Sequence, residues 1–244
     1  MAYRNETYLL NKWHTEKASK PLTNEQRQSI EQFYNALKEK QGKNLSYKGA
    51  RNYMIAKAEL NLCYRISDIV KLKIKDVIKQ PSKNHYGDSF EDLYDFDIDD
   101  IEIKDTISIV EQKTKKKGDR EISEEFKRDL KSYLQCRRWK ERFTSMNDYL
   151  FQSQKGQHIT AKSAIRIITN ASKKIGWKIT THSLRKTYGT MRLEKVIKNP
   201  IDYNNTLIEL MVIYGHTNTE ITKRYLYIHD NEIKKLMKNS EFYL

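Results

Sequence analysis

Residues 215–225 read Gly-His-Thr-Asn-Thr-Glu-Ile-Thr-Lys-Arg-Tyr, and residues 182–185 read His-Ser-Leu-Arg. Together the two stretches hold two histidines, an arginine and a tyrosine. A guanidinium group binds phosphate oxygens in pairs, an imidazole moves protons, and an activated phenol can attack phosphorus. The two stretches therefore indicate chemistry on a phosphodiester, with both histidines, Arg185 and Tyr225 near one phosphate.

The order His-x-x-Arg, then Gly-His, then Tyr nine residues after that second His resembles the tyrosine recombinase (phage integrase) family. Members of this family cut and rejoin DNA through a phosphotyrosine bond. The resemblance runs from about Leu22 to the end of the chain. It implies a mainly α fold with a small antiparallel β-sheet (α+β), the tyrosine-recombinase catalytic-domain fold, and chemistry that needs neither a cofactor nor a metal.

The resemblance also implies a role for each matched residue. Two arginines would clamp the phosphate, a tyrosine would attack it, one histidine would transfer protons and the other would hydrogen-bond the phosphate, and a lysine would protonate the leaving 5′ oxygen. An aspartate three residues after the first arginine would support it. In that order of roles, the residues are Arg65 and Arg185, Tyr225, His182, His216, Lys113, and Asp68.

Two of these assignments have rivals in the sequence itself. The hairpin that carries Lys113 also carries Lys115, Lys116 and Lys117, so the catalytic lysine could be displaced by two positions. Tyr227 follows Tyr225 by two residues and is a second candidate nucleophile. Structural roles also remain open: Arg65 with Asp68 could form a surface ion pair, His182 with Arg185 a helix-terminus pair, His216 a helix cap, and Tyr225 a core residue.

The overall charge agrees with a nucleic-acid partner. The chain of 244 residues has a net charge of +14, and a field of that sign favours polyanions by counterion release and steered encounter. We therefore expect duplex DNA as the partner. The side chains expected to contact it lie on two predicted helices, residues 48–57 and 161–174, and on the hairpin: Lys48, Arg51, Lys57, Lys115, Lys162 and Arg166.

Cysteine usage and hydropathy exclude several other protein classes. The two cysteines, Cys63 and Cys136, have no CxxC or Cys/His spacing, which argues against a disulfide framework or a zinc site. No run of about eighteen apolar residues would span a membrane, and the first twenty residues do not resemble a signal peptide. We expect a cytoplasmic protein with no membrane partner.

Helix and strand signals divide the chain into an N-terminal arm, residues 1–20, and one catalytic domain, residues 21–244. Helices are predicted to begin near Thr23, at about 48, and after Ser123 and Thr160, and one that includes Leu207 is predicted to end at Gly215. Arg65 is predicted to open a short helix. Ala164, Ile165 and Ile168 are predicted to face inward. Alternating apolar residues between 96 and 122 predict an antiparallel sheet whose Lys-rich turn is 113–118.

Two segments suggest interactions with other molecules. Residues 88–105 are rich in carboxylates, which is unusual in so basic a chain; they form either a solvated loop or a surface that repels DNA or contacts a second subunit. The tail 228–244 carries an apolar stripe too short to be stable alone, consisting of Ile233, Leu236, Met237 and Phe242. The resemblance implies that this tail links subunits into a tetramer on paired sites; packing on its own domain is the alternative. An accessory directionality protein is a further candidate partner.

The leading functional hypothesis is a site-specific recombinase or integrase. Two alternatives remain open. One is a DNA-binding regulator that keeps the fold but does not recombine. The other is an enzyme of the type IB topoisomerase kind, which would relax supercoiled DNA without a particular site.

Overall fold

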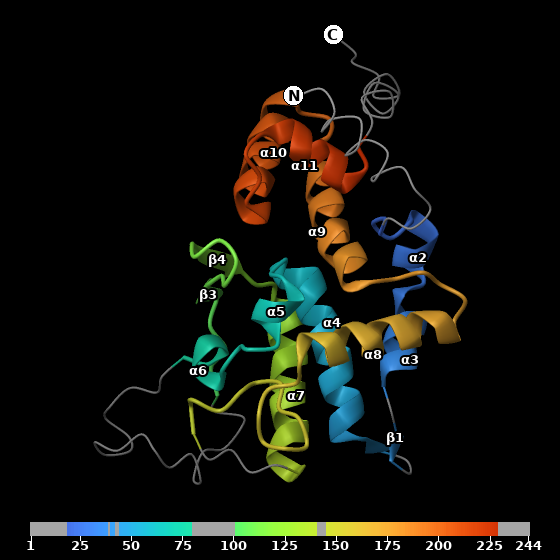
Figure 1. The fold of residues 1–244 in the computed structure, drawn as a ribbon, viewed down its shortest axis with the longest axis vertical. Helices are drawn as coiled ribbons and strands as arrows, with labels where there is room; N and C mark the ends of the chain where they lie inside the picture. The colour runs from blue at the N-terminus through green and yellow to red at the C-terminus, as the bar shows by residue number, and fades with distance from the viewer. Residues whose placement is uncertain (1–18, 39, 42–43, 80–100, 141–144, 229–244) are drawn as a thin grey trace, which may run out of the picture. The chain divides into compact units, whose positions relative to one another are not determined.

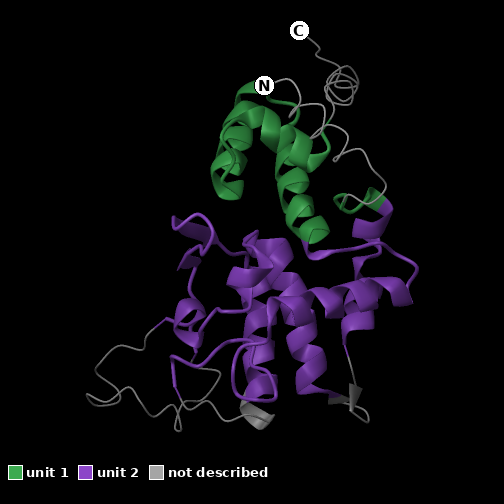
Figure 2. Ribbon diagram, viewed as in Figure 1, with its two compact units in different colours: residues 1–24, 182–244 green, residues 25–181 purple. Residues whose placement is uncertain are grey.

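The computed structural model describes residues 19–38, 40–41, 44–79, 101–140 and 145–228. Its internal contacts group the chain into two compact units, coloured separately in Figure 2. The larger unit comprises residues 25–181, and the other comprises residues 1–24 together with 182–244. Residues 1–18, 80–100 and 229–244 lie outside the described residues, and with them most of the predicted arm 1–20, of the acidic segment 88–105 and of the tail 228–244.

The larger unit is built mainly from helices. The long helices α4 and α7 pack together, and α8 packs on α3 and α4, crossing α4 in Figure 1. The helices of this unit are α2 (Asn24–Gln28), α3 (Ile30–Leu37), α4 (Tyr47–Leu62), α5 (Ile66–Ile69), α6 (Ile74–Val77), α7 (Glu124–Lys140) and α8 (Ala161–Lys174).

Local sequence explains where these helices begin. The side chain of Ser46 accepts a hydrogen bond from the backbone N–H of Gly49 and caps α4, and Thr160 caps α8 in the same way through Ser163. Arg65 is the N-cap residue of α5, as the sequence predicted. The apolar faces of the helices meet in a core that includes Phe33, Met54, Leu62, Phe126, Leu134 and Ile168.

Two short antiparallel hairpins complete the larger unit. Strand β1 (Lys40–Gln41) pairs with β2 (Asn44–Leu45), and β3 (Thr106–Val110) pairs with β4 (Lys117–Glu121). In the second hairpin Ile107 lies opposite Arg120 and Ile109 opposite Gly118. The fold is therefore mostly helical with small antiparallel sheets, which confirms the predicted fold class.

The other unit consists of α9 (Thr181–Val196), α10 (Pro200–Tyr214) and α11 (Thr219–Leu226). Asn199 caps α10, which has Pro200 at its first turn, and Asn218 caps α11. Helix α10 ends at Gly215, whose φ of 71° is in the left-handed region. The first motif therefore lies at the start of α9, and the second runs from the turn after α10 into α11.

One detail of the predicted core is wrong. Ile165 was expected to face inward, but 42% of its surface is exposed, whereas Ala164 and Ile168 on the same helix are buried. Helix α8 therefore presents a narrower buried face than the run of apolar residues suggested; its packing partners include α3, α4 and α5.

Candidate active site

In the smaller unit, three of the predicted catalytic side chains gather around Tyr214, the last residue of α10. The Tyr214 ring centroid lies 5.5 Å from that of His216 and 4.8 Å from that of Tyr225. The guanidinium carbon of Arg185 lies 5.2 Å from the centroid of the same ring. The His216 and Tyr225 rings also meet edge to face, with centroids 5.2 Å apart.

Backbone geometry delivers His216 to this cluster. Because Gly215 adopts the left-handed conformation, the chain reverses after α10, and the N–H of His216 donates to the carbonyl of Met211 at 2.9 Å. The imidazole is then held from the other side, since its Nδ1 lies 3.0 Å from Oγ1 of Thr222 on α11. His216 is therefore oriented by the turn and by the helix that carries Tyr225.

Arg185 is fixed by α10. The residue is only 4% exposed, and its guanidinium donates to the carbonyl oxygen of Ile213 at 3.4 Å. The Tyr214 hydroxyl in turn donates to the Arg185 carbonyl at 3.0 Å. His182 lies three residues earlier, in the first turn of α9, and is exposed.

Tyr225 is buried and lies on α11, and Tyr227 ends that helix. Tyr227 has a φ of 60°, a conformation uncommon for a residue with a bulky side chain. Both rings lie close to the ammonium group of Lys186, at 4.7 Å for Tyr225 and 4.6 Å for Tyr227. The two candidate nucleophiles therefore have different backbone conformations but share one cation.

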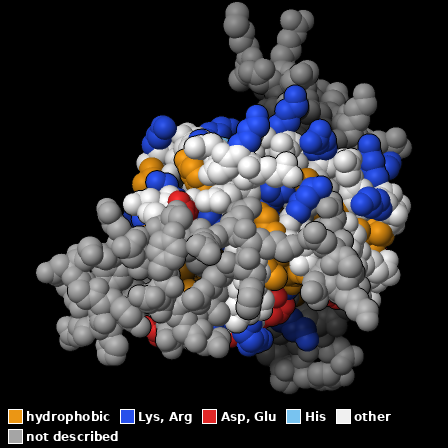
Figure 3. Space-filling view, turned by 90° about the horizontal axis from the view of Figure 1, so that it is seen from below, with side chains coloured by type: hydrophobic (Ala, Val, Ile, Leu, Met, Phe, Trp, Pro, Cys, Tyr) orange, Lys and Arg blue, Asp and Glu red, His pale blue; other side chains and the backbone are white. Residues whose placement is uncertain are grey.

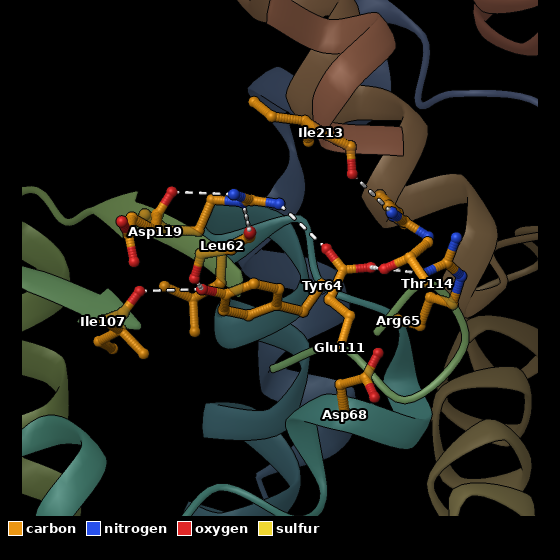
Figure 4. Close-up of polar contacts among 12 residues, drawn as sticks. Leu62, Tyr64, Arg65, Asp68, Ile107, Glu111, Thr114, Asp119 and Ile213 are labelled. Atoms are coloured by element: carbon orange, nitrogen blue, oxygen red, sulfur yellow. Dashed lines mark hydrogen bonds and ion pairs between the residues drawn. The ribbon is translucent and has the colours of Figure 1, made fainter. Parts of the chain in front are cut away.

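In the larger unit, the first predicted arginine is held by a buried carboxylate. Figure 4 shows Arg65 beside Glu111, and the guanidinium and carboxylate lie 2.5 Å apart. Glu111 also pairs with Arg120 at 3.4 Å. Asp68 is buried, and its Oδ1 accepts a hydrogen bond from the backbone N–H of Gln112 at 3.1 Å. Burial of Asp68 argues against the alternative of an exposed ion pair between Arg65 and Asp68.

These contacts dock the turn that carries Lys113 onto α5. The turn is closed by backbone hydrogen bonds from Lys115 to Glu111 and from Glu111 to Lys116, and Lys115 has a φ of 56°. Lys113 follows the docked residues directly and is exposed, as are Lys115 and Lys116. Because Glu111 and Gln112 are tied to Arg65 and Asp68, Lys113 is the lysine of the turn nearest in sequence to the anchored part.

Tyr64 and Arg120 connect the hairpin to the residues at the end of α4. The Tyr64 hydroxyl lies 2.9 Å from the carbonyl oxygen of Ile107 and 2.6 Å from that of Gly118, one on each strand. Arg120 donates to the carbonyl oxygen of Leu62 at 3.1 Å. The residues at the end of α4 therefore hold β3 and β4, and through them the turn with Lys113.

The predicted DNA-contacting residues divide into exposed and buried groups. Lys48, Lys115, Lys162 and Arg166 are exposed. Figure 3, seen from below, shows Lys and Arg side chains scattered over the described surface. Lys48, Arg51 and Arg166 line an open cavity of about 820 Å³ between α4 and α8. Arg51 is buried and donates to the carbonyl oxygen of Gln152 at 2.8 Å.

Lys57 does not fit the predicted DNA contact. It is 8% exposed, and its ammonium lies 2.8 Å from Glu125 and 3.0 Å from Asp129, both on α7. Burial by itself would lower the lysine pKa, but together the contacts with these two carboxylates outweigh it and raise the pKa. Lys57 therefore joins α4 to α7, because its helix face is covered by a neighbour that the local sequence pattern does not reveal.

Three residues of the site were missed by sequence reasoning. Tyr214, Glu111 and Lys186 were not singled out from the sequence. Their partners lie far away in sequence: Glu111 pairs with Arg65, and Lys186 contacts Tyr225. The only local signal was the position of Glu111 next to the predicted hairpin turn and of Lys186 directly after Arg185.

Two features are absent from the described residues. Within them, no group of three or more His, Cys, Asp or Glu side chains is arranged to hold a metal ion. Across the same ranges, no helix is both long enough and apolar enough to cross a membrane.

Sequence comparison identifies a matching family and a similar protein. The model described as the Phage integrase family matches residues 90–232, more than half of the chain. The probable integrase/recombinase YoeC of Bacillus subtilis (strain 168) is 29% identical over 193 residues, which cover 78% of this chain and 85% of YoeC.

Structure comparison finds the same fold in recombinases. XerA recombinase aligns with a TM-score of 0.59 and 20% identity, over 93% of this chain and 66% of XerA. The Tn1549 transposon integrase in complex with transposon right end DNA aligns with a TM-score of 0.58 and 20% identity, over 93% of this chain and 67% of the integrase. XerH bound to its palindromic difH substrate aligns with a TM-score of 0.57 and 21% identity, over 88% of this chain. The chain spans only 51% of XerH.

Proposed function

Because the chain belongs to the phage integrase family, we propose that it is a site-specific recombinase that cleaves and rejoins duplex DNA through a 3′-phosphotyrosine intermediate. The observation that carries this proposal is the cluster of Arg185, His216 and Tyr225 around Tyr214. The name of YoeC and the DNA present in the XerH and Tn1549 integrase structures support DNA as the partner. The net charge of +14 supports it independently.

In the first chemical step, the Tyr225 oxygen attacks the scissile phosphorus. The bond from phosphorus to the 5′ oxygen breaks while the bond to Tyr225 forms. The phenol proton passes to His182, and Lys113 protonates the departing 5′ oxygen. Arg65 and Arg185 place positive charge on the nonbridging oxygens, where negative charge accumulates in the transition state, and His216 donates a hydrogen bond to the phosphate.

In the second step, a 5′ hydroxyl attacks the phosphotyrosine and releases Tyr225. The number of phosphodiester bonds is unchanged, so the reaction consumes no ATP. In this proposal the named side chains supply the positive charge and the protons without a cofactor or a metal. In our proposal the 5′ hydroxyl comes from a partner duplex, and the protein works in the cytoplasm as a tetramer on paired sites. The tail 228–244 links the subunits, and an accessory protein sets the direction.

Covalent capture tests the chemistry directly. Wild-type protein, Tyr225→Phe and Tyr227→Phe are incubated with fragmented genomic DNA from the source organism, then denatured. Protein-linked fragments are isolated, and their ends are sequenced. We expect adducts at discrete sites with wild type and Tyr227→Phe, and none with Tyr225→Phe. Adducts that persist in Tyr225→Phe and disappear in Tyr227→Phe would transfer the nucleophilic role to Tyr227.

The same experiment separates the rival functions. A regulator that keeps the fold would bind the DNA tightly but give no adduct with any of the three proteins. An enzyme of the topoisomerase kind would give adducts scattered over many sequences and would relax supercoiled plasmid. Adducts at discrete DNA sites, together with no relaxation of a supercoiled plasmid that lacks those sites, would support the recombinase.

A further inference from the structure

The residue after Arg185 occupies an unusual position. Lys186 lies on α9, is only 3% exposed, and directs its ammonium between two aromatic rings of another helix. Its Nζ is 4.7 Å from the ring centroid of Tyr225 and 4.6 Å from that of Tyr227. Both distances are within the range over which a cation is attracted to the face of an aromatic ring.

The third contact of Lys186 is with the segment that leads into α2. Its ammonium donates a hydrogen bond to the carbonyl oxygen of Ser19 at 2.6 Å. The next residue of α9 holds the same segment, because the Thr187 hydroxyl accepts a hydrogen bond from the N–H of Leu22. Leu22 and Tyr227 also line one small cavity of about 200 Å³. Lys186 therefore lies where α9, the N-terminal segment and the end of α11 meet.

We propose that Lys186 is a positioning residue for the nucleophile: its ammonium holds the rings of Tyr225 and Tyr227 together and thereby sets where Tyr225 stands. The part of this inference that concerns catalysis rests on the proposed function. The arrangement explains why Tyr227 keeps its left-handed backbone conformation, with a φ of 60°. The Tyr227 ring contacts the Lys186 ammonium, which also contacts Tyr225, and the attraction offsets the unfavourable backbone geometry of Tyr227.

The contact between Lys186 and the two rings depends on pH because the ammonium group loses its charge when it is deprotonated. Burial lowers the pKa of Lys186 to about 8. The phenols of Tyr225 and Tyr227 are titratable and face the ammonium from α11, whereas the N-terminal segment presents the non-titrating Ser19 carbonyl. On α9 itself, the guanidinium of Arg185 is directed to Ile213 and Tyr214. Above pH 8 the neutral amine can still donate to Ser19 but no longer attracts the rings.

The first test needs no DNA. Protein labelled with ¹³C in the tyrosine rings is titrated from pH 6 to 9, and the resonances of Tyr225 and Tyr227 are assigned from the two Phe variants. We expect both resonances to shift with a shared midpoint near pH 8 in wild type and in the control Lys195→Met, which changes an exposed lysine of the same helix. In Lys186→Met the shared shift should vanish. Resonances that do not shift in wild type overturn the proposal.

The second test follows the rate of adduct formation. We expect Lys186→Met to lose on the order of tenfold, the size of one partly desolvated cation–π contact. Lys186→Arg should recover most of the rate and, because a guanidinium stays charged, should retain it above pH 8 where wild type declines. A residue that only fills space would give parallel pH profiles in all three proteins, and that outcome would overturn the proposal.

The two tests separate this inference from the proposed function. Wild-type protein without any adduct would contradict the recombinase proposal, and the NMR titration alone would then decide whether Lys186 holds the two rings. Wild-type adducts that depend on Tyr225 but not on Lys186 would leave the recombinase standing and remove the positioning role.

Discussion

The carboxylate of Glu111 lies 2.5 Å from the guanidinium of Arg65, and both belong to the larger unit. Glu111 stands two residues before Lys113, the proposed acid for the leaving oxygen, and Arg65 is a proposed phosphate ligand. This partly buried ion pair therefore orients the proposed phosphate ligand and anchors the turn that carries the proposed proton donor. The geometry gives Glu111 a supporting role for both residues.

Removing Glu111 should destabilise the larger unit. Glu111→Ala leaves Arg120 buried without this carboxylate, and losing one partner of a buried pair costs about 3 kcal/mol. Urea denaturation followed by circular dichroism should show the lower midpoint. Glu121→Gln, at an exposed position of β4, is the control and should unfold like wild type. An unchanged midpoint for Glu111→Ala would mean that the pair contributes nothing to folding.

Gly189 should tolerate no side chain. A Cβ at this position would lie 2.4 Å from the Tyr214 hydroxyl and 2.9 Å from Leu226, so Gly189→Ala must displace the residue at the centre of the cluster. We expect a loss of about 1–3 kcal/mol in the free energy of unfolding. Tyr214→Phe removes the oxygen that clashes, so the double variant should lose less than the sum of the two single variants. If the free-energy losses of the two single variants simply add up in the double variant, Gly189 and Tyr214 do not interact and the prediction is wrong.

The exposed and buried lysines should differ in DNA binding. Lys48→Met and Arg166→Ala should each reduce the slope of log affinity against log salt by about 1, the value for one lost phosphate contact. Lys57→Met should leave that slope unchanged, because the Lys57 ammonium pairs with Glu125 and Asp129. Fluorescence anisotropy with one labelled duplex at several salt concentrations measures all three. A reduced slope for Lys57→Met would restore it as a DNA contact.

The titration of Lys186 should make the free energy of unfolding depend on pH. Its folded-state pKa is about 8, below the ordinary lysine value of 10.5, so between these values the unfolded chain binds more protons than the folded one. The contribution of this group to stability therefore rises as pH increases from 8 towards 10.5. Thermal unfolding of wild type and Lys186→Met at pH 7.5 and 9.5 checks this. The midpoint of wild type should gain relative to the variant at the higher pH, and equal differences at both pH values would contradict the prediction.

Several features of the fold could be predicted because their causes are local. Ser123 and Thr160 each accept a hydrogen bond from the backbone N–H three residues later, so the starts of α7 and α8 could be predicted from the sequence beside them. The turn at Gly215 follows from one residue that adopts positive φ without strain. The order of the motif residues was likewise sufficient to indicate the family.

Other features depend on partners that are distant in the sequence. Lys57 and Lys48 look alike on one predicted helix, but α7 covers only the first, and Ile165 looks apolar enough for the core yet lies on the uncovered side of α8. The same reason explains why Glu111 and Lys186 were missed. By itself, the sequence determined where several helices begin or end and which residue types are available for the proposed chemistry, because capping and helical periodicity act over a few residues. Only the tertiary structure decided which charge meets which ring or carboxylate, because each of those contacts joins segments that the chain brings together only when it folds.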